Sequence, residues 1–211
     1  MTTLLIATTN PGKLLEIRQF LSDLPVTLVS LKDVGITDNV EETGKTFDEN
    51  AKLKATYYAK KSGLITIADD GGFEIDALGG EPGVHSHRWV DRTRESSDEE
   101  LIAYTFTRLK DVPEGNRGAQ LRLVLALADP KGAIIKTTEA KIRGIVPMTP
   151  SSVRHEGFPY RSILFIPELN KFYDHMSFTP EETERYNHRK RALELIKPAI
   201  RSLLTPETGT V

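Results

Sequence analysis

The spacing of apolar residues predicts alternating strands and helices in the first third of the chain. Residues 4–7 form a short apolar run typical of a buried strand, and the turn at residues 10–12 follows it. Apolar residues then recur at three- and four-residue spacing from position 14 to position 24, which predicts a helix. A second apolar run over residues 64–68 predicts another buried strand, ending at the acidic pair that follows.

Three capping boxes mark the starts of further helices. In each one a Ser or Thr is followed three residues later by Glu, so that each side chain can bond the other residue's backbone N–H. The pairs are Thr46 with Glu49, Ser97 with Glu100, and Thr179 with Glu182. We expect the first of these helices to stop at Gly63, and the last to reach Lys197, where Pro198 should kink or end it.

The second half of the chain has the two-residue period of strands. Leucines alternate with other residues over 121–127, and a turn sequence occupies residues 129–132. Residues 119–146 therefore predict a long antiparallel hairpin, and residues 163–166 predict one more strand. Because helices and strands are interleaved, we expect an α/β protein with a mixed sheet that contains this hairpin.

Composition narrows the class of protein. The chain has 211 residues, with 30 acidic and 28 basic side chains and a net charge of −2, which argues against nucleic acid or an anionic membrane as a partner. It contains no cysteine, so disulfides, thiolate catalysis and cysteine-bound metals are excluded. The N-terminal residues do not resemble a signal peptide, and no apolar run is long enough to span a bilayer. We expect a soluble cytoplasmic protein.

The segment Thr8-Thr9-Asn10-Pro11-Gly12-Lys13 joins the first expected strand to a helix N-terminus. Such a junction offers backbone N–H groups beside the positive end of the helix dipole, which suits phosphate oxygens. Lys13 adds a positive charge, and Thr and Asn side chains add hydrogen-bond donors. The alternative is an ordinary strand–turn–helix junction with a solvated lysine.

Two acidic pairs, Glu41-Glu42 and Asp69-Asp70, are candidates for a metal site. Adjacent carboxylates repel each other and therefore need a cation or a functional use. Carboxylates from two segments suit Mg²⁺, which keeps waters and also binds substrate phosphates. The alternative is two solvated acidic turns. Lys54 contributes only if it points toward this site, and for Asn50, four residues before it, an exposed helix face is favoured.

The basic run at residues 187–191 is the last candidate feature. Such a run is most often a solvated helix face, and its alternatives are phosphate binding and, less favoured, nucleic acid.

Taken together, these segments indicate a protein family much more specifically than any one of them does alone. Residues 8–16, 41–55 and 68–88 resemble, in order and spacing, the inosine/xanthosine triphosphate pyrophosphatase family. The resemblance continues through the hairpin to Asn187-His188-Arg189 and so covers nearly the whole chain.

The resemblance implies one two-lobed domain over residues 1–204, with a nucleotide cleft between the lobes. From the sequence itself we expect a flexible tail at 205–211. The resemblance also implies a homodimer that uses Mg²⁺ to hydrolyse noncanonical purine nucleoside triphosphates (ITP, dITP, XTP) to the monophosphate and pyrophosphate. Asp70 matches the general base, and Glu41 (or its neighbour Glu42) and Asp70 match the metal ligands, with Asp69 in support. The substrate-binding positions are Thr8, Thr9, Asn10, Pro11, Gly12, Lys13, Lys54, Gly71, Phe158, Pro159, Tyr160, Arg161, His188 and Arg189.

The chain departs from the family pattern at three positions. Gly71 replaces the usual serine, so one hydroxyl is missing, and Thr183 replaces a lysine whose charge Arg185 or Arg161 could supply. Arg161 stands where the family has an aspartate that meets the purine edge, while Phe158 and Tyr160 keep aromatic surfaces for a base.

The replacement at Arg161 exchanges an acceptor for donors, so the preference for the base cannot simply be inherited. In the alternative arrangement Arg161 turns outward or pairs with a carboxylate such as Glu156. Two other functions stay open from the sequence: a pyrophosphatase with another base preference, and a nucleotide-binding sensor without turnover.

Overall fold

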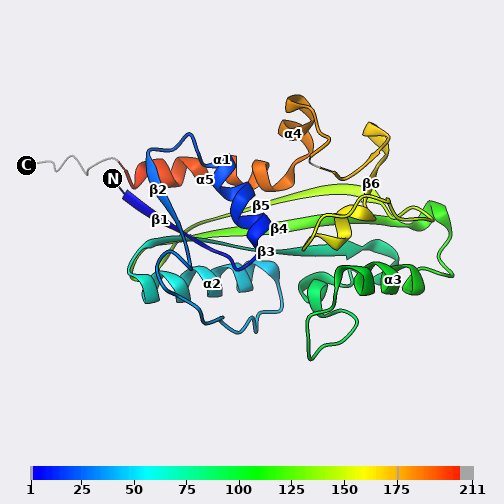
Figure 1. The fold of residues 1–211 in the computed structure, drawn as a ribbon, viewed down its shortest axis with the longest axis horizontal. Coiled ribbons are helices and arrows are strands. Elements are labelled where there is room, and N and C mark those ends of the chain that lie inside the picture. Colours follow the sequence, from blue (N-terminus) through cyan, green and yellow to red (C-terminus); the bar gives the residue numbers. More distant parts are fainter. Residues whose placement is uncertain (1, 175, 205–211) are drawn as a thin grey trace, which may run out of the picture. The chain divides into compact units, whose positions relative to one another are not determined.

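A computed structural model describes residues 2–174 and 176–204, and it contains a seven-stranded mixed sheet (Figure 1). The strand order is β2-β1-β3-β4-β5-β6-β7. β1 runs parallel to both β2 and β3, whereas β6 is antiparallel to β5 and β7. The strands are β1 (Thr2–Ala7), β2 (Val26–Ser30), β3 (Ile65–Ile75), β4 (Gly118–Ala128), β5 (Ile134–Ile145), β6 (Phe165–Ile166) and β7 (Lys171–Phe172). The expected α/β class and the long hairpin, formed by β4 and β5, are confirmed.

The α-helices begin where the capping signals predict. Thr46, Ser97 and Thr179 each accept a hydrogen bond from the third residue of their helix, whose Glu side chain bonds back to the cap. The left-handed Gly63 ends the second helix. The helices are α1 (Pro11–Phe20), α2 (Phe47–Ser62), α3 (Asp98–Arg108), α4 (Pro180–Tyr186) and α5 (His188–Ser202). None of the helices within the described residues is long and apolar enough to cross a membrane.

The chain forms two compact units, and β3, β4 and β5 contribute residues to both. The first unit comprises residues 1–70, 124–139 and 189–211. In it α2 covers one face of the strands, and α1 and α5 cover the other (Figure 1). Its core includes Leu5, Ile6 and Ile67, which are completely buried. Thr138 on β5 ties the sheet to α5 by donating a hydrogen bond to the Ala192 carbonyl, 2.9 Å away.

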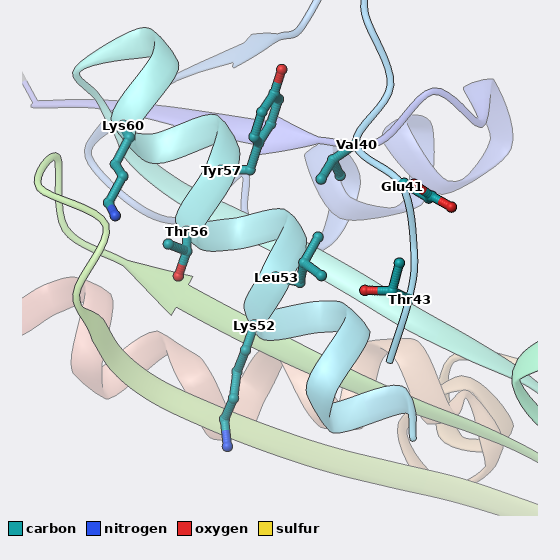
Figure 2. A pocket seen from close by; sticks show the side chains of 8 residues that line it. All are labelled: Val40, Glu41, Thr43, Lys52, Leu53, Thr56, Tyr57 and Lys60. Carbon is teal, nitrogen blue, oxygen red and sulfur yellow. The ribbon is translucent and has the colours of Figure 1, made fainter. Parts of the chain in front are cut away.

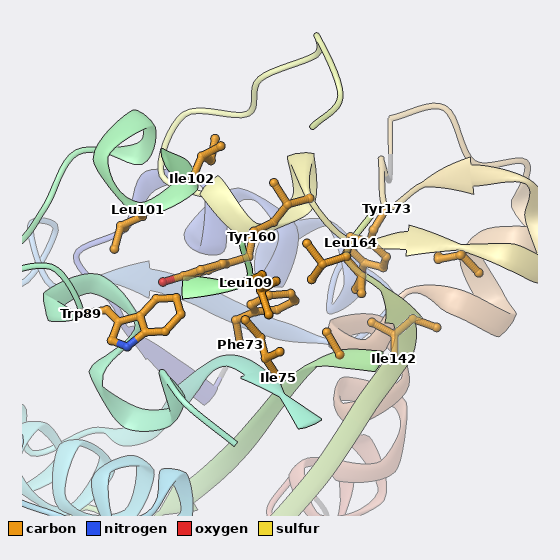
Figure 3. Close-up of a cluster of buried hydrophobic side chains, with 14 residues drawn as sticks. Phe73, Ile75, Trp89, Leu101, Ile102, Leu109, Ile142, Tyr160, Leu164 and Tyr173 are labelled. Atoms are coloured by element: carbon orange, nitrogen blue, oxygen red, sulfur yellow. The ribbon is translucent and has the colours of Figure 1, made fainter. Parts of the chain in front are cut away.

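The second unit comprises residues 71–123 and 140–188. A cluster of buried side chains from β3, β5, α3 and the segment before β6 forms its core (Figure 3). The stacked rings of Phe73 and Tyr160, 4.7 Å apart between centroids, lie in this cluster. The Tyr160 hydroxyl donates a hydrogen bond to the Ser86 carbonyl at 2.6 Å, so this buried polar group is satisfied.

The register of the parallel strands brings two chain segments together. Ala7 at the end of β1 lies opposite Ala68 of β3. Thr8 comes directly after Ala7, and Asp69 comes directly after Ala68. The segment of residues 8–13 and the acidic pair therefore begin at the same level of the sheet. Polar side chains of separate segments therefore meet where β1 ends, as in other open α/β sheets.

Two expected boundaries are wrong. β3 does not end at the acidic pair but continues to Ile75, because Asp69 and Asp70 find cationic partners that allow them to stay buried. The helix opened by Thr179 stops at Tyr186, where Asn187 adopts an extended conformation, and α5 begins afresh at His188.

Pro198 does not end α5, which continues to Ser202. A proline inside a helix leaves the carbonyl four residues earlier without its N–H partner. Both Pro198 and Glu194 are exposed, so water can bind that carbonyl.

Smaller differences concern short elements. Pro11 and Gly12 are the first residues of α1 rather than a turn, since Pro fits the first helical position. The strand expected at residues 163–166 is limited to β6, and β2 and β7 were not expected. The tail expected at 205–211 lies outside the described residues.

Candidate active site

The segment between β1 and α1 is ordered by its own side chains. Asn10 caps α1, and its Oδ1 accepts a hydrogen bond of 3.0 Å from the backbone N–H of Lys13. The Asn10 backbone N–H in turn donates to Thr8 Oγ1 at 3.2 Å. This arrangement places Lys13 in the first helical turn, close to Asp69 in the middle of β3.

Asp69 is the centre of a buried charge cluster that joins β3, α1 and α5. Its Oδ2 lies 3.1 Å from Lys13 Nζ and 2.6 Å from Arg189 Nη1. Arg189 also donates from Nε to Glu16 Oε2 at 2.7 Å. Burial would raise the pKa of Asp69, but the charges of Lys13 and Arg189 outweigh it and hold that pKa well below its usual range.

Asp70 belongs to a second cluster with a different electrostatic character. Its Oδ1 lies 2.8 Å from Lys54 Nζ, and the same Nζ lies 2.8 Å from Glu42 Oε1. Burial raises the pKa of Asp70; Lys54 opposes this shift only in part, and Glu42 adds to it. Burial alone would lower the pKa of Lys54, yet the carboxylates of Asp70 and Glu42 raise it.

The two adjacent aspartates therefore suit different tasks. Asp69 is held ionised between two cations, which is typical of a structural ion pair. Asp70 is a buried carboxylate with a raised pKa beside one lysine, which is typical of a group that accepts and releases a proton.

The structure separates the neighbouring residues Glu41 and Glu42. Glu42 contacts Lys54 and so shares a cation with Asp70. Glu41 instead lines a pocket of about 610 Å³ beside α2 (Figure 2). The other residues that line this pocket are Val40, Thr43, Lys52, Leu53, Thr56, Tyr57 and Lys60. Of the two glutamates, Glu42 is therefore the one that shares a cation with Asp70.

Sequence reasoning missed two residues of these clusters, Glu16 and Asn50. Glu16 is 4% exposed and binds Arg189, although nothing in its helical spacing distinguishes it from a surface glutamate. The favoured interpretation of Asn50 as an exposed helix residue is wrong, since it is 1% exposed and its Nδ2 lies 3.3 Å from Asp70 Oδ2. Its four-residue spacing from Lys54 was the available signal.

In the second unit, Arg161 is buried, so the outward orientation is wrong. It is 3% exposed, and its guanidinium carbon lies 3.8 Å from the centre of the Phe158 ring. The same carbon lies 5.6 Å from the centre of the Tyr173 ring. A guanidinium held between aromatic faces keeps its charge and a fixed orientation.

The remaining candidates of the second unit are more enclosed than expected. Pro159 and Tyr160 are buried, and Phe73 covers one face of the Tyr160 ring, so Tyr160 is a core residue and not an open surface for a base. His188 is buried as well, and its Nδ1 shares a hydrogen bond of 2.8 Å with the Tyr173 hydroxyl.

Gly71 lies against the backbone of β4. A Cβ atom at this position would come within 2.5 Å of the Arg122 carbonyl oxygen and 2.7 Å of Leu123 Cβ. The glycine that removes a hydroxyl from the family pattern therefore also permits a close strand contact.

Comparison with known proteins identifies the family of the chain. The sequence pattern of the Ham1 family matches residues 4–199, which include both charge clusters. The chain belongs to the Ham1 family. The resemblance found in the sequence is thereby confirmed.

Individual relatives of this Ham1 protein cover nearly its whole length. It is 39% identical over 194 residues to the dITP/XTP pyrophosphatase of Thermus thermophilus, covering 92% of this chain and 89% of the relative. It is 40% identical over 198 residues to the dITP/XTP pyrophosphatase of Geobacter sulfurreducens, covering 93% and 96% of the two chains. The solved structure of a HAM1 protein from Coxiella burnetii matches with a TM-score of 0.82 and 29% identity, covering 96% of this chain and all of that one.

Replacing each of the two aspartates by asparagine should affect the free energy of unfolding differently. Asp69→Asn removes the shared partner of Lys13 and Arg189, which should lower the free energy of unfolding by about 3–5 kcal/mol. Asp70→Asn removes a carboxylate whose ionised form burial disfavours, so stability at neutral pH should be unchanged or higher. Chemical denaturation of both variants at pH 7 measures the difference.

The pH dependence provides a control. Since the pKa of Asp69 is lowered by folding, its contribution is complete above the unfolded pKa of about 3.9 and is lost only at more acid pH. The deficit of Asp69→Asn should thus persist from pH 8 to about pH 4 and shrink below that. Equal stabilities for the two variants would contradict the division of roles.

Proposed function

We propose that this Ham1 protein hydrolyses noncanonical purine nucleoside triphosphates of the dITP and XTP type to the monophosphate and pyrophosphate. Its relatives from Thermus thermophilus and Geobacter sulfurreducens carry the name dITP/XTP pyrophosphatase and match over most of their length. The observation that carries the proposal is the buried Asp70, which shares Lys54 with Glu42 at the end of β1 and has a raised pKa.

The donor set around Asp70 fits Mg²⁺. Asp70 and Glu42 already hold one cation, the ammonium of Lys54, between their carboxylates. Among the described residues no group of three or more acidic, His or Cys side chains could hold a metal by itself. Mg²⁺ commonly uses one or two carboxylates together with waters and substrate phosphates. We therefore assign Asp70 and Glu42 as its ligands in place of Glu41, and the ion would supply charge neutralisation at the phosphates.

The residues of the first unit can divide the remaining work. Asp70 accepts a proton from the attacking water, and its raised pKa makes the carboxylate a stronger base. The water oxygen bonds to the α-phosphorus, and the bond from that phosphorus to the bridging oxygen breaks. Lys13 and Lys54, with the segment from Thr8 to Gly12, neutralise and orient the departing pyrophosphate. Arg189 contributes indirectly by holding Asp69, since its guanidinium binds Asp69 and Glu16.

A pyrophosphate-release assay tests the proposed activity. With dITP, XTP, ITP and the four common deoxynucleoside triphosphates, we expect release from the first three to exceed release from dATP, and to stop when EDTA removes the metal. Asp70→Asn should reduce turnover by at least about 10²-fold, the scale of a lost general base. Turnover of the variant near the wild-type level, or release of inorganic phosphate alone, would exclude this reaction.

Base preference is the part of the function for which Arg161 matters most. We propose that Arg161, together with Phe158, Pro159 and His188, belongs to the base-recognition segment, with Tyr160 as its support in the core, and that Gly71 contacts substrate through its backbone. A guanidinium offers only donors, and it therefore favours a base edge with carbonyl oxygens or ring nitrogens over the exocyclic amine of adenine. Its stacking on Phe158 orients the fork.

Arg161→Asp returns the residue usual in the family and should change discrimination between bases. A lost hydrogen bond to a charged group corresponds to roughly 10- to 100-fold, so the ratio of kcat/KM for ITP to that for ATP should change by about tenfold or more. Arg161→Lys serves as control, because it keeps the charge without the fork. Identical ratios in all three proteins, each checked for an intact melting transition, would show that Arg161 does not contact the base.

We also propose a cytoplasmic homodimer. The dimer follows the family resemblance, and the first unit exposes two large leucines, Leu15 on α1 at 69% and Leu195 on α5 at 58%. A sequence without cysteine suits a reducing compartment. Light scattering on the purified chain of 23.6 kDa should give about twice that mass. A mass equal to one chain at micromolar concentration would contradict the dimer.

A further inference from the structure

We propose that Asn50 is a positioning residue that fixes both the Asp70 carboxylate and the loop carrying Glu42, through the two ends of one buried amide. The inference rests on the proposed function of Asp70 as general base. Asn50 lies on α2 and is 1% exposed, so neither end of its amide is free to turn toward solvent.

The donor end of the amide acts on Asp70. Asn50 Nδ2 lies 3.3 Å from Asp70 Oδ2, whereas Lys54 Nζ contacts the other oxygen, Oδ1, at 2.8 Å. Two donors four residues apart on one helix thus hold the two oxygens of the same carboxylate. This fixes the plane of the carboxylate and hence the direction from which it can accept a proton.

The acceptor end of the amide acts on the loop before α2. Asn50 Oδ1 accepts a hydrogen bond of 2.8 Å from the backbone N–H of Gly44, two residues after Glu42. The approach is so close that a Cβ atom at Gly44 would lie 2.5 Å from Asn50 Oδ1. Only glycine fits there, so the contact between amide and loop is built into the backbone at position 44.

An uncharged amide is required for both contacts. A carboxylate at position 50 could still accept from Gly44, but it would place a second negative charge against Asp70. An apolar side chain would leave both the Gly44 N–H and Asp70 Oδ2 without this partner. The amide of Asn50 therefore supplies both the acceptor that the Gly44 N–H needs and the donor that Asp70 Oδ2 needs.

The experiment compares Asn50→Asp, which keeps only the acceptor, with Asn50→Ala, which keeps neither contact. Two quantities are measured: kcat and KM for pyrophosphate release from dITP, and the exchange rate of the Gly44 amide hydrogen. We expect both variants to lose at least about tenfold in kcat with little change in KM. Exchange at Gly44 should become at least about tenfold faster in Asn50→Ala and stay near the wild-type rate in Asn50→Asp.

Ser62→Ala is the matched control, since it removes a side-chain hydrogen bond to the Tyr58 carbonyl on the same helix, away from Asp70. It should lower the melting temperature without changing kcat or exchange at Gly44. If Asn50→Ala, assayed well below its melting temperature, keeps kcat within about threefold of wild type, the residue is merely structural and the proposal fails. Wild-type protein that releases no pyrophosphate would instead overturn the proposed function, while exchange at Gly44 would still show whether Asn50 holds the loop.

Discussion

The ion pair between Asp69 and Arg189 holds β3 and α5 together, and the arrangement of the candidate site in the first unit depends on it. It links the middle of β3 to the start of α5, 120 residues later in the chain. Glu16 and the partly exposed Lys13 of α1 complete the cluster, so the three elements around the end of β1 are joined by ion pairs in which Asp69, Glu16 and Arg189 are buried. Such a cluster costs desolvation, and it is retained only where every member has a partner in good geometry.

One consequence concerns the neighbouring residue. Because Lys13 and Arg189 neutralise Asp69, the carboxylate of Asp70 can be buried next to it without facing an uncompensated charge. Lys54 then only partly offsets the burial of Asp70, and the raised pKa follows. Because both carboxylates have cationic partners, β3 continues without interruption across the two aspartates. Two adjacent carboxylates of one strand thus have pKa values shifted in opposite directions.

Features set by local sequence were predictable, and features set by distant contacts were not. The capping boxes at Thr46 and Ser97 depend on residues three positions apart, and they mark the helix starts correctly. The burial of Asn50 depends on Asp70 and Gly44, which local periodicity cannot reveal. The break at Asn187 was likewise hidden, because the residues on both sides of it favour helix.

The candidate site follows the same division. The acidic pairs, Lys13 and Lys54 could be proposed from residue type and order, and the structure gathers Glu42, Lys54 and Asp70. The sequence could not separate Glu42 from Glu41, since adjacent residues in an irregular segment have no fixed period. It also suggested an open aromatic surface at Tyr160, whereas packing on Phe73 encloses the ring.

Gly71 limits the mutational routes by which this chain could acquire a serine at that position. Any side chain there would meet the Arg122 carbonyl at 2.5 Å, and a carbonyl in a strand cannot move alone. A hydroxyl at position 71 therefore requires a compensating shift of β4, so the two changes must arise together or in a fixed order. The spacing of two strands can thus preserve a glycine next to Asp70, whatever ligand the chain binds.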